Sequence, residues 1–166
     1  MTDALIRPAS PEDLPGLVDI FNHYVRHGHV TFETVPYTVD SRRRWFERYG
    51  AGRHRLLVAT LQGQVLGCTY SSPYRPTPAF ETTVETSIYL HPDHRGRGTG
   101  LRLYTALFEL LAQQDVHVAV AAVALPNPGS LALHRRMGFT EVGTFREYAR
   151  KNGAWISSTW FQRPVR

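Results

Sequence analysis

The segment from Thr82 to Leu111 constrains the fold most, because its hydrophobic period changes within a few residues. From residue 82 to 90 the side chains alternate. One face carries Val84, Thr86, Ile88 and Leu90, and the other carries Glu85, Ser87 and Tyr89. This period of two predicts a strand. After a glycine-rich turn, apolar residues recur at helical spacing from 101 to 111, so the segment is predicted to be a strand–loop–helix unit.

Similar patterns flank this unit. We expect a short strand at 5–6, a helix from Ser10 to about Val25, a basic helix from Asp40 to about Tyr49, a hairpin over 56–70, a strand over 116–124 buried on both faces, a helix from Asn127 to 137, and a closing antiparallel pair at 139–145 and 155–161. Strands alternating with helices predict one α/β domain over residues 1–166, with a mixed sheet covered by helices.

The composition narrows the class of protein. The chain has 166 residues and a formal net charge of +5, with 42% apolar residues, which suits one folded domain. Cys68 is the single cysteine, so no internal disulfide forms, and its strand context predicts a buried structural residue. The N-terminus lacks a secretory pattern and no apolar run reaches membrane-helix length, so we expect the cytoplasm.

The positive charge alone leaves nucleic acid, a membrane surface and an anionic ligand as possible partners. The run from Arg42 to Arg44 fits a solvated helix face better than a phosphate patch. No nucleic-acid-binding motif accompanies the charge. His23 and His27 have no third ligand at a suitable spacing, so we expect no metal.

The loop from Arg95 to Gly100 lies between a strand and a helix. Its backbone N–H groups and the positive end of the helix dipole suit a phosphate, and glycines let a ligand approach the backbone. The glycine spacing fits neither a dinucleotide fingerprint nor a P-loop. A turn without a ligand is the alternative.

Three further residues stand out. Glu85 is a carboxylate on the polar face of the strand, and is either a general base or a rim residue paired with an arginine. Asn127 and His134 lie on one side of a helix, about two turns or roughly 10 Å apart. Asn127 is also a good N-cap, and His134 also fits the edge of the core.

These residues carry a resemblance. The run Arg95-Gly96-Arg97-Gly98-Thr99-Gly100 resembles the Arg/Gln-x-x-Gly-x-Gly/Ala pyrophosphate loop of the GNAT superfamily of acetyl-CoA-dependent N-acetyltransferases. Phe21-Asn22-His23-Tyr24, Val30-Thr31-Phe32, Thr83-Val84-Glu85, Leu125-Pro126-Asn127 and Leu133-His134 are similar to the phosphinothricin (methionine sulfoximine) N-acetyltransferase family. The likeness spans almost the whole chain.

The resemblance implies a mostly antiparallel sheet of about six or seven strands, with two central parallel strands splayed for acetyl-CoA. It assigns cofactor contacts to Ile88, Tyr89, Leu90, Arg95, Gly96, Arg97, Gly98, Thr99, Gly100, Leu101 and Asn127. Glu85 becomes the expected base for the amine. His134 stands where many members have a tyrosine that protonates the leaving thiolate, and is a proton donor or a substrate contact. The resemblance also implies a homodimer, and herbicide resistance through phosphinothricin.

The substrate loop departs from the family pattern. Members usually show Arg/Lys-x-Arg-x-Ala-Tyr, whereas this chain has Arg75-Pro76-Thr77-Pro78-Ala79-Phe80. The second basic residue and the hydroxyl are missing, so an amine other than phosphinothricin or methionine sulfoximine remains open. We expect Phe32, Arg75 and Phe80 in the substrate pocket.

Overall fold

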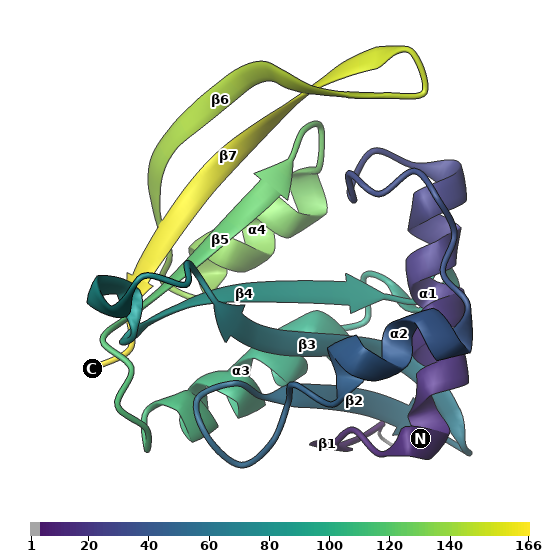
Figure 1. Cartoon of the computed structure of the whole chain (residues 1–166), viewed down its shortest axis with the longest axis horizontal. Coiled ribbons are helices and arrows are strands. Elements are labelled where there is room, and N and C mark those ends of the chain that lie inside the picture. Colours follow the sequence, from purple (N-terminus) through teal and green to yellow (C-terminus); the bar gives the residue numbers. More distant parts are fainter. Residues whose placement is uncertain (1–3) are drawn as a thin grey trace.

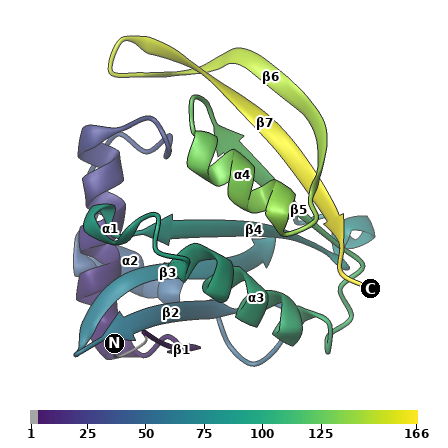
Figure 2. The same cartoon turned by 180° about the vertical axis from the view of Figure 1, so that it is seen from behind.

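The fold is built on one seven-stranded sheet, seen in a computed structural model that describes residues 4–166 (Figures 1 and 2). The strands are β1 (Leu5–Pro8), β2 (Leu56–Leu61), β3 (Gln64–Pro73), β4 (Thr83–Leu90), β5 (Val118–Ala124), β6 (Thr140–Lys151) and β7 (Ala154–Pro164). Their order is β1-β2-β3-β4-β5-β7-β6, and β4 with β5 is the parallel pair. The predicted mixed, mostly antiparallel sheet is confirmed. Residues 1–3, which begin the N-terminal segment that lacks a secretory pattern, lie outside the described residues.

Helices cover both faces of the sheet. They are α1 (Leu14–His27), α2 (Val39–Phe46), α3 (Thr99–Leu111) and α4 (Pro128–Arg136). Helices α1 and α2 lie on one face, and α3 and α4 on the other (Figures 1 and 2). Successive side chains of β2 point to opposite faces of the sheet and contribute to both cores. Leu57 and Ala59 join the core under α3, whereas Leu56 and Val58 join the core under α1. Within residues 4–166 no helix has the length and apolar character needed to span a membrane.

Cys68 lies in the core under α1 and is fully buried. Burial raises the pKa of its thiol to about 12, so the thiol stays protonated and unreactive at neutral pH. The prediction of a structural cysteine is confirmed.

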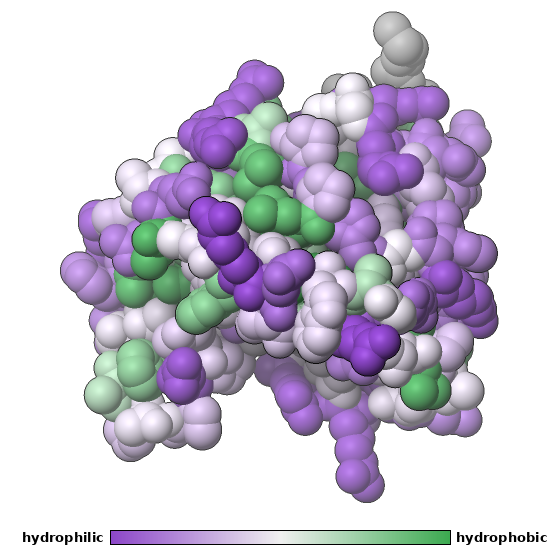
Figure 3. All heavy atoms as spheres, turned by 90° about the horizontal axis from the view of Figure 1, so that it is seen from above, coloured by the Kyte–Doolittle hydropathy of each residue, from purple (hydrophilic) through white to green (hydrophobic). Residues whose placement is uncertain are grey.

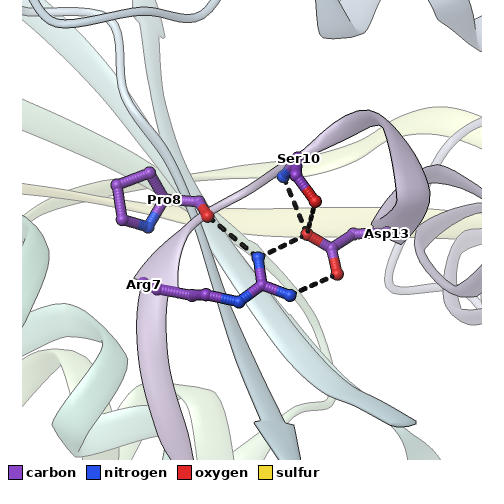
Figure 4. A network of polar contacts seen from close by, with 4 residues as sticks. All are labelled: Arg7, Pro8, Ser10 and Asp13. Atoms are coloured by element: carbon purple, nitrogen blue, oxygen red, sulfur yellow. Dashed lines mark hydrogen bonds and ion pairs between the residues drawn. The ribbon is translucent and has the colours of Figure 1, made fainter. Parts of the chain in front are cut away.

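A paired charge fixes the start of α1 against β1 (Figure 4). Arg7 donates from Nη1 and Nη2 to the two carboxylate oxygens of Asp13, at 2.7 and 2.8 Å. The Ser10 N–H donates to Asp13 Oδ2 at 2.8 Å. This bidentate pair orients α1, whose other end reaches the functional site.

The parallel strands β4 and β5 separate soon after they meet. They pair only from Thr83 with Val118 to Glu85 with Val120. Beyond Glu85, β4 stays paired with β3 up to Leu90, and β5 stays paired with β7 up to Ala124. The strand ends therefore diverge into a wedge, visible in Figure 1, as the resemblance implied.

Four elements differ from their predictions. Helix α2 is capped by Thr38 rather than by Asp40, because Thr38 Oγ1 accepts from the Ser41 N–H at 3.1 Å. Strands β6 and β7 run longer than expected, since β6 is exposed along most of its length and has no alternating pattern to read. Strand β5 is not buried throughout: Ala122 is exposed because it lies beyond the point where β4 departs.

Candidate active site

Two cavities meet at the wedge between β4 and β5. The larger has a volume of about 680 Å³ and lies between the strand ends and the N-termini of α3 and α4. The smaller, of about 340 Å³, lies on the side of α1 and α2. They share the lining residues Val30, Ser87, Tyr89, Ala122 and Ala124. The two cavities therefore border each other along the last part of β4.

The glycine-rich loop forms one end of the larger cavity. Gly96 and Gly98 have φ angles of 73° and 80°, which favour glycine, and Gly98 is the N-cap of α3. The Arg102 N–H bonds back to the Gly98 carbonyl, so the N–H groups that precede it in the first turn are free for a ligand. Together with Arg95 and the helix dipole, this loop is a positively polarised cradle suited to a pyrophosphate.

The structure places most predicted cofactor residues in this larger cavity. Those lining it are Ile88, Tyr89, Leu90, Arg95, Gly96, Gly98, Gly100, Leu101 and Asn127. Among the described residues, the lining does not include Arg97 or Thr99. Asn127 is the N-cap of α4, since its Oδ1 accepts from the Ser130 N–H at 3.2 Å, and it also lines the cavity. The Leu90 carbonyl already accepts a hydrogen bond from the Tyr24 hydroxyl at 2.5 Å.

His134 lines the larger cavity but is only 2% exposed. Its Nδ1 lies 2.7 Å from the Ser130 carbonyl, which can only accept, so Nδ1 carries the proton in the neutral ring. Nε2 lies 3.0 Å from the Tyr104 hydroxyl and then accepts from it. Burial lowers the pKa of His134, which favours this neutral form. The hydroxyl of Tyr104 therefore stands beside the histidine as a second polar group of the cavity.

Glu85 lines the smaller cavity together with Ser87 and Tyr89, the polar face predicted for this strand. It is the last residue of β4 that pairs with β5, so its carboxylate sits at the apex of the wedge. Burial raises its pKa above the usual carboxyl range. The alternative of a rim residue paired with an arginine does not hold, since the ion pairs within residues 4–166 do not include Glu85.

Aromatic rings and one arginine form the rest of the smaller cavity, and the sequence did not single them out as site residues. Phe21, Tyr37, Trp45 and Tyr70 line it beside Arg42. Arg42 was expected on a solvated helix face, and that expectation is wrong for this residue. The Arg42–Trp45 spacing of three, which puts both on one side of a helix, was the available signal.

The predicted substrate residues divide between two places. Phe32 lines the smaller cavity. Arg75 and Phe80 are not among the described residues that line either cavity. Instead, the Arg75 guanidinium stacks on Tyr74 and Phe80, at 5.2 and 6.0 Å from the ring centroids. Within this chain the structure therefore does not bring Arg75 together with Glu85.

The loop between α1 and α2 is held over both cavities. His29 Nε2 lies 2.7 Å from the Pro126 carbonyl, which links this loop to the end of β5. Buried Lys151, from the end of β6, donates to the carbonyls of Tyr24 and Thr31 at 3.0 and 2.9 Å. These contacts fix the side chains of the loop that face the site.

Sequence comparison assigns this arrangement to a family. Residues 6–160 match the acetyltransferase (GNAT) domain. The chain belongs to the GNAT family of acetyltransferases. It is an acetyl-CoA-dependent acetyltransferase, and the cradle of the larger cavity fits the phosphates of this cosubstrate. Within the described residues, no group of three or more His, Cys, Asp and Glu side chains could hold a metal ion.

The relatives of this GNAT protein show which acetyltransferases it is similar to. It is 46% identical to the phosphinothricin N-acetyltransferase of Streptomyces coelicolor, covering 96% of this chain and 95% of the relative. It is 37% identical to the L-methionine sulfoximine/L-methionine sulfone acetyltransferase of Pseudomonas aeruginosa, covering 96% and 93%. The structure of a GNAT phosphinothricin acetyltransferase from Sinorhizobium meliloti in complex with acetyl-CoA superposes with a TM-score of 0.92 at 30% identity, covering 98% and 89%.

Proposed function

We propose that this GNAT acetyltransferase transfers acetyl to the α-amino group of a small amino acid related to phosphinothricin or methionine sulfoximine. The observation that carries the proposal is the position of Glu85 at the apex of the wedge, in a small cavity that shares a wall with the cosubstrate cleft. The names of the relatives support the substrate class.

The loop from Arg95 to Leu101 would hold the pyrophosphate of acetyl-CoA, and the strand ends at Ile88–Leu90 and Asn127 would flank its arm. When bound, acetyl-CoA supplies an activated acetyl thioester. Two features of the loop suit the phosphates of acetyl-CoA. The N–H groups of the first turn of α3 are free, and the φ angles of the glycines leave room for an anion.

Glu85 is the proposed general base. An α-amino group has a pKa near 8, so it arrives at neutral pH largely protonated and cannot act as a nucleophile. A carboxylate whose pKa burial has raised is a stronger proton acceptor than an exposed one. Glu85 would take one proton, directly or through a water, and expose the nitrogen lone pair.

His134 and Tyr104 are proposed to act as a pair at the other side of the wedge. The ring accepts from Tyr104 through Nε2 and donates to Ser130 through Nδ1. The histidine would hold the tyrosine side chain in place through this hydrogen bond. The hydroxyl has a single proton, which it gives to Nε2 in this structure, so it would stabilise the leaving sulfur by turning that proton away from Nε2. His134 then acts through Tyr104 rather than as a direct donor.

A panel of amines tests the proposed function. Thiol release from acetyl-CoA and the mass of the acetylated product are measured with phosphinothricin, L-methionine sulfoximine, L-methionine sulfone and common amino acids. We expect acetylation of at least one of the first three on its α-nitrogen. Thiol release at the background hydrolysis rate for every amine would overturn the proposal.

Substitution of the cradle glycine tests the cosubstrate site. Gly98→Ala is expected to raise the KM for acetyl-CoA about 10-fold or more, because it strains a φ of 80° and adds a methyl group beside the free N–H groups. Gly153→Ala is the matched control: it has the same φ of 80° but lies in the β6–β7 turn. Equal KM values for both variants would contradict this assignment.

We also propose that the enzyme works as a homodimer, which the family resemblance implies, and that it works in the cytoplasm, which the N-terminal sequence favours. The β6–β7 hairpin exposes the apolar side chains Val142, Phe145, Tyr148 and Trp155, with exposed fractions from 45% to 63%. Figure 3 shows hydrophobic side chains among hydrophilic ones on the face that looks up in Figure 1, the side of this hairpin. Such a group of apolar residues suits an interface.

Light scattering after size exclusion tests the dimer. Phe145→Glu is expected to shift a dimer to a monomer, because it places a charge in the middle of the apolar hairpin. Leu5→Glu, at an equally exposed residue of the opposite edge strand β1, should leave the mass unchanged. A monomeric mass for the unmodified protein would overturn the proposed dimer.

A further inference from the structure

Arg42 occupies a position unlike that of its two neighbours in the basic run of α2. Its guanidinium carbon lies 3.9 Å from the ring centroid of Trp45, 4.3 Å from that of Tyr37 and 4.7 Å from that of Phe21. Arg43 instead pairs with Asp40 at 2.9 Å on the surface, and Arg44 is exposed. Of the three arginines, Arg42 alone lines the smaller cavity of the described chain.

The guanidinium of Arg42 has unused hydrogen-bonding capacity. Its Nε is shielded from solvent and has no hydrogen-bond partner within residues 4–166. The ion pairs of the same residues do not include Arg42, although Glu33 lines the same cavity. An atom shielded from solvent is also closed to a ligand, so a ligand oxygen in the cavity would accept instead from Nη1 and Nη2. These two groups make no hydrogen bond within residues 4–166 and are not among the shielded atoms. A carboxylate matches the planar fork of arginine.

The charges around the cavity are arranged for a zwitterion. Glu85 on β4 and Glu33 in the loop before α2 contribute carboxylates, and Arg42 on α2 contributes the cation, to the same 340 Å³ space. An α-amino acid carries a positive amine and a negative carboxylate a few bonds apart, so one molecule can face both kinds of group. Arg75, the cation that the sequence favoured for the substrate, does not line this cavity among the described residues and stacks on Tyr74.

We propose that Arg42 is the carboxylate anchor of the acetyl acceptor, holding its α-carboxylate while the α-amine faces Glu85. This inference rests on the proposed function, because it assigns a specificity residue to the same site. The stacked rings of Phe21, Tyr37 and Trp45 keep the guanidinium in one orientation, which reduces the freedom that it loses on binding. The enzyme should therefore select free amino acids over amines whose carboxyl group is blocked.

The test compares two probes with three proteins. The probes are L-methionine sulfone and its carboxyl methyl ester, and the proteins are the unmodified enzyme, Arg42→Gln and the control Arg44→Gln. Steady-state KM and equilibrium binding in the presence of CoA are both measured. We expect Arg42→Gln to raise KM and Kd for the free acid about 10- to 100-fold and to leave those for the ester within about 2-fold. Arg44→Gln should change neither.

Arg42→Lys is a control for misfolding. It keeps the positive charge among the rings but removes the planar guanidinium group. It should bind CoA normally and bind the free acid more weakly than the unmodified enzyme does. An equal loss for the acid and the ester in Arg42→Gln, or no loss for the acid, would overturn the assignment of Arg42.

The two readouts separate this inference from the proposed function. Binding of the acid that depends on Arg42, without acetyl transfer, would support the anchor and contradict the transferase proposal. Acetyl transfer to acid and ester with equal KM values would overturn the anchor and support the transferase. Binding of neither probe would overturn the anchor, whatever other amine the panel finds to be acetylated.

Discussion

Glu85→Gln is expected to lower kcat/KM for the amine about 10²- to 10⁴-fold while the Kd of acetyl-CoA stays unchanged. Glutamine keeps the shape and polarity of the side chain at the apex of the wedge but cannot accept a proton from an ammonium group. Glu85 lines only the smaller of the two cavities, which is why cosubstrate binding should survive. Steady-state kinetics and calorimetric titration with CoA measure the two quantities.

The exposed Glu109 of α3 supplies the matched control, since Glu109→Gln removes a carboxylate of the same kind far from the cavities. It should leave both quantities unchanged. Glu85→Gln with at least half of the original kcat/KM would remove Glu85 from the chemistry.

The pH dependence of kcat/KM also tests Glu85 as the general base. Glu85 acts only when ionised, and burial raises its pKa above the ordinary value of 4.5. The activity of the unmodified enzyme should therefore fall as the pH drops through this raised value, so the acid limb of kcat/KM lies above pH 4.5. In Glu85→Gln, the fall in kcat/KM caused by protonation of Glu85 should be missing, and only the pH dependence caused by titration of the amine should remain.

The paired substitutions Tyr104→Phe and His134→Gln should each lower kcat about 10²-fold or more, and the double variant should lose little beyond either single one. The reason is the 3.0 Å contact between the hydroxyl and Nε2, which makes the two side chains one unit. Rapid-mixing measurements of a single turnover report the chemical step without product release. Losses that multiply in the double variant would show that the residues act separately.

The stability of the same variants provides a control. Tyr104→Phe leaves the buried Nε2 of His134 without its donor, which typically costs about 1–3 kcal/mol of unfolding free energy. Urea denaturation measures this change. A kcat loss in a variant that is fully folded at the assay temperature then reports on the chemistry rather than on unfolding.

The sheet and the larger cavity, our proposed acetyl-CoA site, could largely be predicted from the sequence. The switch of period between residues 82 and 111 predicts β4, the loop and α3 in order, and the side chains of Glu85, Ser87 and Tyr89 share the predicted face. Local patterns determine these features, because a strand, a glycine turn and a helix each leave a period or a residue type in the chain. The prediction that β4 and β5 diverge came only from the family resemblance.

The smaller cavity, our proposed substrate site, could not be predicted in the same way. Its wall joins α1, α2, β4, β5 and β7, which lie far apart in the sequence and meet only in the folded chain. Arg42 was interpreted as surface because its two arginine neighbours suggested a solvated run. Its environment depends on rings contributed by α1 and by the loop before α2, and pairings of this kind leave no local period.

A crystal structure of the enzyme with CoA and its best amino acid substrate would test the central claim most directly. We expect the pyrophosphate on the amides of residues 96–101 and the amine within hydrogen-bond reach of Glu85, directly or through one water. An amino acid whose nitrogen points away from Glu85, or a CoA bound outside the wedge of β4 and β5, would contradict it.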